Sequence, residues 1–435
     1  MNLRISPVPV LEGEIEVPGD KSISHRALLL NALARGRAQV RNLGPGADVQ
    51  ATRRCLEALG VRVEADNGVM VVEGVGGAFR EPEDVLDAGN SGTTLRLLAG
   101  VLAAQPFLSL ITGDASLRSR PMGRIVEPLR LMGAQLWGRK GDSLPPLAIR
   151  GGALRGIKYP LPIPSAQVKS AILLAGLFAS GRTEVEEPLP SRDHTERLLS
   201  RMGVPVERQG SRVALSALSS PLAPLDLTVP GDLSSAAYFL VVGLVHPRAR
   251  LRVRGVGVNP TRSGLLDALK EMGARLSLEN LREEGGEPVA DLVVESSQLQ
   301  AISLGAETIP RLIDEVPVLA VAATQARGTT TIRGAEELRV KESDRLAGMA
   351  RGLSRMGARV EELPDGLAIH GPTPLQGARV DSQGDHRLAM ALGVAALLAQ
   401  GETLIEGAEA VDISYPGFFH VLKGLGASSL ARRQE

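Results

Sequence analysis

Hydrophobic and polar positions along this chain form one pattern that recurs six times. In each copy an amphipathic, helix-like segment ends in Met-Gly or Leu-Gly. The six glycines are 73, 70, 70, 84 and 69 residues apart, at Gly60, Gly133, Gly203, Gly273, Gly357 and Gly426. Glycine directly after the last apolar helical position is a common helix stop. The pattern therefore predicts a structural repeat with an amphipathic helix in each copy.

A second feature of the pattern keeps the same period. A small-polar or acidic turn precedes an Ala- and Leu-rich segment six times, at Lys21, Ser91, Ser165, Asp232, Asp314 and Asp385. These segments are apolar on most faces, which predicts helices buried inside their domains. Alternating residues at 61–74, 204–216 and 358–371 predict β-hairpins. The predicted unit is a buried helix, a strand, an amphipathic helix and a hairpin, and the alternative is a purely structural repeat without a site.

Composition and charge narrow the class of protein. The 435 residues are enough for two or three domains. Because 49 basic residues balance 49 acidic ones and aromatics make up 2%, we expect neither nucleic acid nor a membrane as a partner. We also expect no signal peptide at the N-terminus and no membrane span at 95–112.

Cysteine and histidine usage gives two further expectations. The single cysteine, Cys55, excludes an intramolecular disulfide and fits a reducing cytoplasm. The six histidines show no metal-ligand spacing with a cysteine or carboxylate cluster, so no metal site is predicted.

Charged and small residues gather at the predicted starts of the buried helices. A helix N-terminus has unpaired N–H groups and a partial positive charge, so it attracts anions. Lys21 is one of only 7 lysines among the 49 basic residues, which favours a specific role over ordinary surface charge. For Ser22 and Ser165 the alternative is plain helix capping, and for the charged segments 118–124, 191–196 and 339–345 it is a solvated surface.

Seven segments in order carry a resemblance to a known family. They read PGDKSISHR, GNSGTTLRLLAG, DASLRSRPM, PSAQVKSA, SRDHTE, LRVKESDR and GDHRLAM. In these segments, which extend over nearly the whole chain, the sequence resembles the enolpyruvyl transferases, and among them the branch that acts on shikimate 3-phosphate. The resemblance implies a two-domain inverse α/β fold, with three βαβαββ units in each domain around buried helices and an interdomain cleft. We expect one domain at 19–229 and the other at 1–18 and 230–435.

The resemblance also implies a reaction. The enolpyruvyl group of phosphoenolpyruvate passes to the 5-hydroxyl of shikimate 3-phosphate and phosphate is released, without a metal or other cofactor. Asp314 is implied to accept the hydroxyl proton, and either Glu342 or Lys21 to protonate the methylene carbon. The herbicide glyphosate competes with phosphoenolpyruvate in this family, and Gly92 is implied to border its pocket.

The implied ligands form two sets. For phosphoenolpyruvate they are Lys21, Gly92, Arg120, Gln167, Arg345 and Arg387. For shikimate 3-phosphate they are Lys21, Ser22, Arg26, Ser165, Ala166, Gln167, Ser191, Arg192, Asp314 and Lys341. Arg345 and Arg387 are expected to clamp the phosphoenolpyruvate carboxylate, since a guanidinium binds a planar carboxylate with two hydrogen bonds.

Three positions depart from the family's pattern. Ala166 stands where a second serine is common, Glu337 stands where an asparagine is common, and Ile413 lies in a segment that often carries a lysine. Arg192 is a candidate to compensate for the change at Ala166, and the ligands near Glu337 and Ile413 stay open.

Two rival functions are consistent with parts of the pattern. UDP-N-acetylglucosamine enolpyruvyl transferase shares the implied fold, but that branch typically has Lys-Asn where Lys21 and Ser22 stand. That branch also uses a cysteine in a loop as an acid, whereas Cys55 lies in a predicted amphipathic helix and not in the loop 118–124. A non-catalytic domain or phospho-ligand-binding repeat protein would not need Asp314 and Glu342. We expect a monomeric, cytoplasmic enzyme whose partners are its two small-molecule substrates.

Overall fold

The computed structural model describes residues 1–66 and 68–425. It divides into two compact units. The central unit comprises residues 19–229 with 284–287, and the terminal unit comprises 1–18, 230–283 and 288–435. Gly426, the sixth predicted helix stop, and the last predicted domain residues, 426–435, lie outside the described residues.

The central unit contains helices and short strands in regular alternation. Its helices are α1 (Lys21–Leu33), α2 (Ala47–Ala58), α3 (Gly92–Leu102), α4 (Gly123–Met132), α5 (Arg139–Asp142), α6 (Ala166–Gly176) and α7 (His194–Arg201). Its strands are β3 (Arg35–Arg41), β4 (Arg62–Asp66), β5 (Val69–Val75), β6 (Leu86–Asp87), β7 (Leu108–Thr112), β8 (Gln135–Gly138), β9 (Leu144–Arg150), β10 (Lys158–Pro160), β11 (Arg182–Glu186), β12 (Glu207–Gln209), β13 (Arg212–Ser216) and β14 (Leu227–Thr228).

The terminal unit has the same alternation. Its helices are α8 (Leu233–Val245), α9 (Gly264–Glu271), α10 (Val316–Gln325), α11 (Arg345–Arg355), α12 (His386–Leu398) and α13 (Phe418–Gly424). Its strands are β1 (Asn2–Ile5), β2 (Leu11–Glu16), β15 (Ala249–Gly257), β16 (Arg275–Glu284), β17 (Glu287–Glu295), β18 (Ser303–Leu304), β19 (Gly328–Ile332), β20 (Arg359–Leu363), β21 (Gly366–Gly371), β22 (Arg379–Asp381) and β23 (Thr403–Glu406).

Three of the sheets show the repeat in its simplest form, with orders β6-β7-β9-β8, β10-β11-β13-β12 and β18-β19-β21-β20. In each, the first two strands are parallel and a buried helix connects them, and the last two strands form an antiparallel hairpin. Hairpins occur at the three places where the alternation predicted them, as β4–β5, β12–β13 and β20–β21. The predicted α/β class and its repeat are confirmed.

The first repeat of each unit exchanges its leading strand with the other. β2 precedes α1 in the chain but pairs in parallel with β15 of the terminal unit. β14 precedes α8 in the chain but pairs in parallel with β3 of the central unit. In the sixth repeat no hairpin follows β23 in the described residues, and β1 pairs antiparallel with β23 instead.

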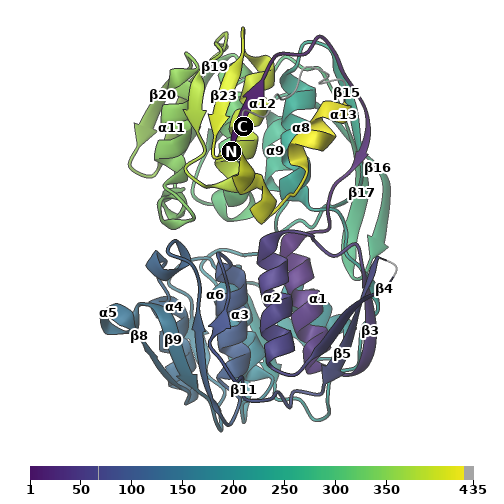
Figure 1. Ribbon diagram of the computed structural model, residues 1–435, viewed down its shortest axis with the longest axis vertical. Helices are drawn as coiled ribbons and strands as arrows, with labels where there is room; N and C mark the ends of the chain where they lie inside the picture. Colours follow the sequence, from purple (N-terminus) through teal and green to yellow (C-terminus); the bar gives the residue numbers. More distant parts are fainter. Residues whose placement is uncertain (67, 426–435) are drawn as a thin grey trace. The chain divides into compact units, whose positions relative to one another are not determined.

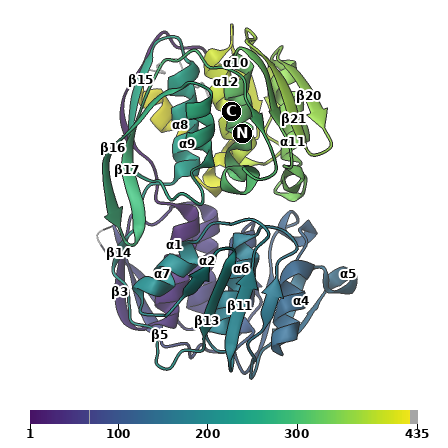
Figure 2. The same cartoon turned by 180° about the vertical axis from the view of Figure 1, so that it is seen from behind.

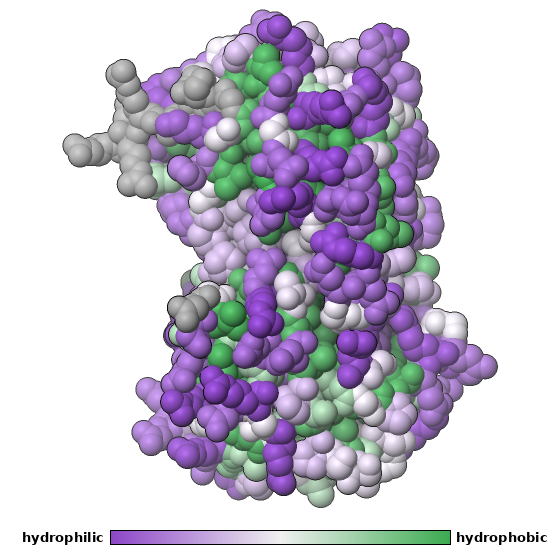
Figure 3. All heavy atoms as spheres, turned by 90° about the vertical axis from the view of Figure 1, so that its right-hand side faces the viewer, coloured by the Kyte–Doolittle hydropathy of each residue, from purple (hydrophilic) through white to green (hydrophobic). Residues whose placement is uncertain are grey.

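The Ala- and Leu-rich helices fill the interior of each unit, as their sequence predicted. In the central unit, α1, α3 and α6 lie among the sheets, with β3 and β5 on one side and β8 and β9 on the other (Figure 1). In the terminal unit α8, α10 and α12 pack together (Figure 2). Each unit has its own apolar core. On the face shown in Figure 3, hydrophilic side chains separate smaller hydrophobic areas.

The predicted helix-stop glycines adopt the left-handed conformation in all five described copies. Their φ angles are +89° at Gly60, +113° at Gly133, +87° at Gly203, +85° at Gly273 and +88° at Gly357. Glycine reaches this region without the clash that a Cβ introduces, so the residue type fixes where each amphipathic helix ends.

Candidate functional site

Side chains cap the starts of the three buried helices in the central unit. Asp20 accepts a hydrogen bond from the Ile23 N–H at 2.9 Å at the start of α1, and Ser91 accepts from Thr94 at 3.1 Å at the start of α3. Ser165 accepts from the Val168 N–H at 3.4 Å at the start of α6. The interpretation of Ser22 as a cap is therefore wrong, because Asp20 has that role. A serine hydroxyl that accepts from the helix can still donate its own hydrogen, so capping and ligand binding are compatible at Ser165.

A chain of buried hydrogen bonds joins the starts of α1 and α3 through α2. His25 Nδ1 lies 2.7 Å from the Thr52 hydroxyl, which lies 2.7 Å from the Thr94 hydroxyl. Burial lowers the pKa of His25 well below its ordinary value, and Lys21 and Arg26 lower it further. The imidazole is therefore neutral. The hydrogen bonds from His25 to Thr52 and from Thr52 to Thr94 link the first turns of α1 and α3 to α2.

The structure brings Gly92, Arg120 and Gln167 together, as members of the predicted phosphoenolpyruvate set. Gln167 Nε2 donates to the Thr93 hydroxyl at 2.9 Å, and Gln167 Oε1 accepts from Arg96. A Cβ at Gly92 would lie 3.0 Å from Arg96 Nη1 and 3.5 Å from Arg120 Nη1. The start of α3 therefore has two guanidinium groups, those of Arg96 and Arg120, close to Gly92.

Arg120 is buried and is itself oriented by polar neighbours. Its Nη2 donates to Asn90 Oδ1 at 2.5 Å and to the Ser116 hydroxyl at 3.1 Å. Asn90 and Ser116 are uncharged acceptors, so these two hydrogen bonds leave the positive charge of Arg120 in place.

Arg26 lies in the interior of the central unit with neutral hydrogen-bond partners. Its Nε donates to the Thr195 hydroxyl at 2.6 Å, its Nη2 to the Ser170 hydroxyl at 2.7 Å and its Nη1 to the Ser22 carbonyl at 2.9 Å. Burial lowers the pKa of Arg26 to about 10; Glu196 opposes this shift and Arg192 adds to it. A buried cation is costly unless an anion approaches it, so Arg26 is suited to bind one.

The remaining predicted site residues of this unit differ in their burial and in their polar contacts. Lys21 Nζ pairs with Asp48 Oδ2 at 3.0 Å. Ser191 is buried and donates its hydroxyl hydrogen to Glu187. Ala166 is the first residue of α6, and its only polar groups are those of the backbone. Ser22 and Arg192 are partly exposed.

In the terminal unit the structure brings Asp314, Glu342, Arg345 and Arg387 together. Arg345 Nη2 donates to Glu342 Oε2 at 2.5 Å, and its Nη1 lies 3.5 Å from Asp314 Oδ1. Arg387 donates to the Asp314 carbonyl at 3.1 Å and lies 3.5 Å from Asp314 Oδ2. Both guanidinium groups are buried, and the nearby carboxylates raise the pKa of each against the opposing effect of burial.

Asp314 differs from the other residues that mark the buried helix starts. Asp232 and Asp385 cap α8 and α12 with their side chains, but Asp314 lies in a 3₁₀ turn, Ile313–Glu315, before α10. The cap of α10 is Glu315, which makes no side-chain cap hydrogen bond. The Asp314 carboxylate faces Arg345 and Arg387 rather than its own helix.

Sequence reasoning missed several polar residues around these groups. Arg96 follows Gly92 by four residues on one helix, so helical spacing alone could have found it. Tyr238 of α8 is fully buried, its hydroxyl has no partner in the described part of the chain, and burial raises its pKa. Asp48, which pairs with Lys21, lies on a different helix, and no local pattern predicts that contact.

Two of the residues that depart from the family's pattern, Ile413 and Glu337, lie in 3₁₀ turns of the terminal unit. Ile413 ends a 3₁₀ turn, Ala408–Ile413, and its side chain packs against the terminal unit's core. Glu337 lies in the turn Glu336–Val340 and is partly exposed, as is Lys341 directly after this turn.

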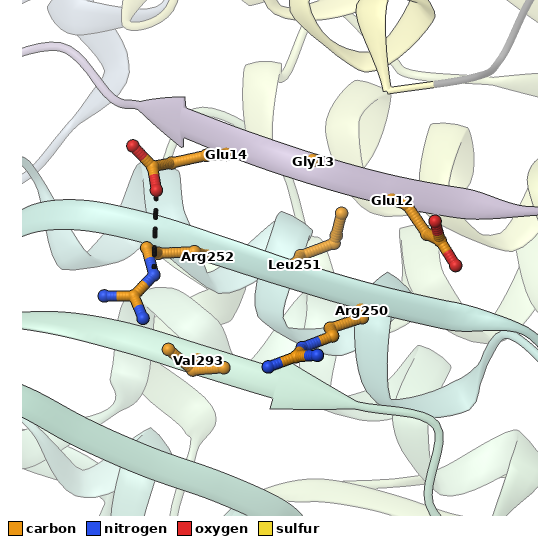
Figure 4. Close-up of a pocket in the computed structure, with 7 residues that line it drawn as sticks. All are labelled: Glu12, Gly13, Glu14, Arg250, Leu251, Arg252 and Val293. Carbon is orange, nitrogen blue, oxygen red and sulfur yellow. Dashed lines mark ion pairs between the residues drawn. The ribbon is translucent and has the colours of Figure 1, made fainter.

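A shallow hollow elsewhere contains none of the predicted site residues. It lies on β2, β15 and β17 and is lined by Glu12, Gly13, Glu14, Arg250, Leu251, Arg252 and Val293 (Figure 4). Two of its charged side chains face one another, and Arg252 Nε lies 3.6 Å from Glu14 Oε2. No group of three or more His, Cys, Asp and Glu suited to a metal ion occurs within residues 1–66 and 68–425. Across the same residues, no helix is long and apolar enough to cross a membrane.

The sequence is similar to those of known enzymes over nearly its whole length. A 3-phosphoshikimate 1-carboxyvinyltransferase from Desulforudis audaxviator is 55% identical over 427 residues, which cover 98% of this chain and 99% of that protein. One from Gloeobacter violaceus is 56% identical over 421 residues, covering 96% and 97%. These similarities extend over the whole of both units.

Solved structures agree with this result. EPSP synthase from Acinetobacter baumannii has a TM-score of 0.88 and 43% identity, covering 99% of this chain and 100% of that one. The enolpyruvyl transferase NikO from Streptomyces tendae, at 19% identity and a TM-score of 0.80 over 98% and 97% of the two chains, shares the fold. The sequence model of the EPSP synthase (3-phosphoshikimate 1-carboxyvinyltransferase) family matches residues 5–422. This chain therefore belongs to the EPSP synthase family.

Proposed function

We propose that this chain transfers the enolpyruvyl group of phosphoenolpyruvate to the 5-hydroxyl of shikimate 3-phosphate, as a step of aromatic amino acid biosynthesis. The products are 5-enolpyruvylshikimate 3-phosphate and inorganic phosphate. The observation that carries the proposal is the group of two buried arginines, Arg345 and Arg387, beside the acids Asp314 and Glu342. Membership of the family supports the same reaction.

The chemistry needs one base, one acid and several cations. The 5-hydroxyl loses its proton and its oxygen bonds to the second carbon of phosphoenolpyruvate while the methylene carbon gains a proton. The carbon–phosphate oxygen bond then breaks, and the methyl group returns a proton as the double bond re-forms. Fixed cations stabilise the charge on the carboxylate and on the departing phosphate.

Asp314 is proposed to accept the hydroxyl proton, and Glu342 or Lys21 to protonate the methylene carbon. Asp314 and Glu342 both lie at Arg345. A proton donor and acceptor must be within hydrogen-bond reach of the reacting atoms, and one shared arginine holds both carboxylates in place.

For phosphoenolpyruvate, Arg345 and Arg387 are proposed to bind the carboxylate, and Arg120, Gln167, Lys21 and the Gly92 N–H to bind the phosphate. Gly92 is the first residue of α3, so its N–H is one of those that no helical carbonyl receives. The absence of a Cβ leaves this N–H open to an anion.

For shikimate 3-phosphate, Ser22 and Arg26 are proposed to bind the carboxylate end, with Lys21 and Gln167 as further contacts. The 3-phosphate is assigned to Ser165, the backbone of Ala166, Ser191 and Arg192. Lys341 is assigned to the phosphate oxygens or the neighbouring hydroxyl, and Asp314 to the reacting hydroxyl. Neutral hydrogen-bond partners at Arg26 support this assignment, because its charge is available to an anion.

Each unit is proposed to act as one enolpyruvyl transferase domain of three repeats, at 19–229 and at 1–18 with 230–435. The enzyme is proposed to work as a cytoplasmic monomer without a cofactor. The single cysteine, Cys55, is buried and unbonded, which supports a reducing compartment.

The direct test is phosphate release from purified protein with phosphoenolpyruvate and shikimate 3-phosphate, against UDP-N-acetylglucosamine as the alternative acceptor. We expect phosphate release from phosphoenolpyruvate when shikimate 3-phosphate is the acceptor and none when UDP-N-acetylglucosamine is the acceptor. The alternative needs a reactive cysteine, but burial raises the pKa of Cys55 to about 12 and its thiol faces the Asp87 carbonyl. Phosphate release with UDP-N-acetylglucosamine only would refute the proposed function.

A further inference from the structure

A buried ionic cluster lies beside Arg26, and none of its three charged side chains is assigned to a substrate in the proposed reaction. Lys169 of α6 is fully buried, and its Nζ lies 2.8 Å from Glu187 Oε2 and 2.8 Å from Glu196 Oε1. We call Lys169, Glu187 and Glu196 the Lys169 cluster. With all three side chains ionised it has one negative charge in excess.

The two carboxylates are held in different ways. Lys169 Nζ donates hydrogen bonds to Glu187 Oε2 at 2.8 Å and to the Ser191 carbonyl at 3.3 Å, and Glu187 also accepts the Ser191 hydroxyl. Glu196 is paired by distance, but both of its oxygens lack an aligned hydrogen-bond donor in the described residues. Glu196 therefore depends on the charge of Lys169 more than on directional bonds.

Arg26 and the Lys169 cluster are held by adjacent residues of the same two helices. Arg26 bonds to Ser170 and Thr195, which directly follow Lys169 and directly precede Glu196. The Ser170 and Thr195 hydroxyls lie 2.7 Å apart. A guanidinium and two buried carboxylates thus occupy one interior region, yet in the described part of the chain Arg26 has only neutral hydrogen-bond partners.

We propose that Lys169 is a positioning residue that keeps Glu187 and Glu196 from pairing with Arg26. By neutralising most of their charge, Lys169 leaves the Arg26 guanidinium available to the anionic substrate. This inference rests on the proposed function, in which Arg26 binds shikimate 3-phosphate.

Two substitutions break the same ion pair but change the field at Arg26 in opposite directions. Lys169→Met removes a positive charge, so the uncompensated carboxylates attract Arg26 and compete with the substrate. Glu196→Gln removes a negative charge. We expect Lys169→Met to raise the KM and Kd for shikimate 3-phosphate on the order of tenfold, and Glu196→Gln to leave them unchanged or lower.

Other readouts separate this role from general loss of structure. The KM for phosphoenolpyruvate, measured at saturating shikimate 3-phosphate, and kcat should change little in either variant. Lys169→Arg should restore binding, because it keeps the charge.

A matched control pair exists in the same unit. Lys158 and Glu184 are paired at 3.3 Å across β10 and β11, and Lys158 is exposed. Lys158→Met and Glu184→Gln should leave both KM values unchanged. Thermal unfolding of each variant establishes that it is folded, and if Lys169→Met does not fold, Glu196→Gln and Lys169→Arg still decide the question.

The result that overturns the inference is a rise in the KM for shikimate 3-phosphate in Glu196→Gln equal to that in Lys169→Met. Equal losses would mean that the ion pair only holds the segment between Glu187 and Glu196. Unchanged binding in a folded Lys169→Met variant would overturn it as well. Failure of the proposed function is distinct, because the wild-type chain would then release no phosphate with shikimate 3-phosphate.

Discussion

At the residue scale, charge compensation organises the acidic and basic side chains of the terminal unit. Arg345 is nearly fully buried and contacts three carboxylates, those of Asp314, Glu342 and Asp385. Arg387 shares Asp314 with it. These carboxylates compensate the charge of both buried guanidinium groups and hold them in place.

The first prediction concerns the proposed base and acid. Asp314→Asn and Glu342→Gln should each lower kcat by roughly 10²–10⁴, the usual range for losing a positioned proton donor or acceptor. Both replacements keep side-chain size, but each leaves Arg345 with one carboxylate fewer. We therefore expect a loss of unfolding free energy smaller than that for the fully buried Asp385, because the Asp314 and Glu342 side chains are 19% and 13% exposed. Steady-state phosphate release measures the effect, and near-wild-type turnover in either variant would show that its assigned role is wrong.

The second prediction concerns Gly92. An added methyl would lie 3.0 Å from Arg96 Nη1 and 3.5 Å from Arg120 Nη1, so Arg96 must move by a few tenths of an ångström. Gly92→Ala should weaken the binding of glyphosate far more than that of phosphoenolpyruvate, because the longer ligand meets the added methyl first. The measurement is the ratio of the glyphosate inhibition constant to the phosphoenolpyruvate KM in both proteins. An unchanged ratio would mean that sensitivity is determined elsewhere.

At the element scale, single side chains both cap helices and orient site residues. Asp385 caps α12 by accepting from the Arg387 N–H at 2.9 Å, and its other oxygen accepts from Arg345 Nε at 2.8 Å and from Ser343 at 3.0 Å. The start of α12 and the position of Arg345 on α11 are therefore coupled through one carboxylate.

The third prediction follows from this double role. Asp385→Ala should cost about 3–5 kcal/mol of unfolding free energy, because it leaves a buried arginine with one carboxylate fewer and removes a cap. Asp385→Asn keeps an acceptor for the cap and should cost less, while still raising the KM for phosphoenolpyruvate. Denaturant unfolding and steady-state kinetics test both variants. Equal destabilisation by the two would show that the cap contributes nothing.

Much of the element pattern could be predicted from the sequence, because its causes are local. A glycine at positive φ ends each amphipathic helix in the described copies, and a polar cap starts most buried helices. No local pattern predicts the exchange of β2 and β14, since each pairs with a strand far away in the sequence. The expected domain bounds, 19–229 and 1–18 with 230–435, came from the family resemblance. The contacts of Lys21 with Asp48 and of Lys169 with Glu187 were missed because each joins side chains of separate elements of the fold, which no local spacing predicts. The roles of the site residues stay predictions.

At the scale of the whole molecule, stability depends on pH through buried histidine. His25 is neutral when folded, because burial lowers its pKa well below the ordinary value of 6.5. The unfolded chain binds a proton at His25 below about pH 6.5 and the folded chain does not, so acid favours unfolding. This contribution to stability is present above pH 6.5 and is lost as the pH falls.

The fourth prediction is a change in that pH dependence. His25→Asn should reduce the decline in unfolding free energy between pH 6.5 and pH 5 by up to about 1.4 kcal/mol per pH unit, the value for one proton. Denaturant unfolding across this range measures it. His420→Asn, at an exposed position, is the control and should leave the slope as it is. A slope unchanged by His25→Asn would mean that the histidine is protonated in the folded state.

The exchange of β2 and β14 has a consequence for the order of events during synthesis. Nearly all of the central unit, residues 19–229, is one continuous segment, and its closing strand β14 leaves the ribosome before any of α8. The terminal unit needs the first residues made, because β2 pairs with β15 and β1 pairs with β23 near the end of the chain. The strand β2 must therefore wait until β15 is made, about 240 residues later, and β1 until β23 is made, about 400 residues later, which is roughly 20–80 s for β1 at usual rates. Truncated nascent chains should be protease-resistant over the central unit while residues 1–18 are still cleaved.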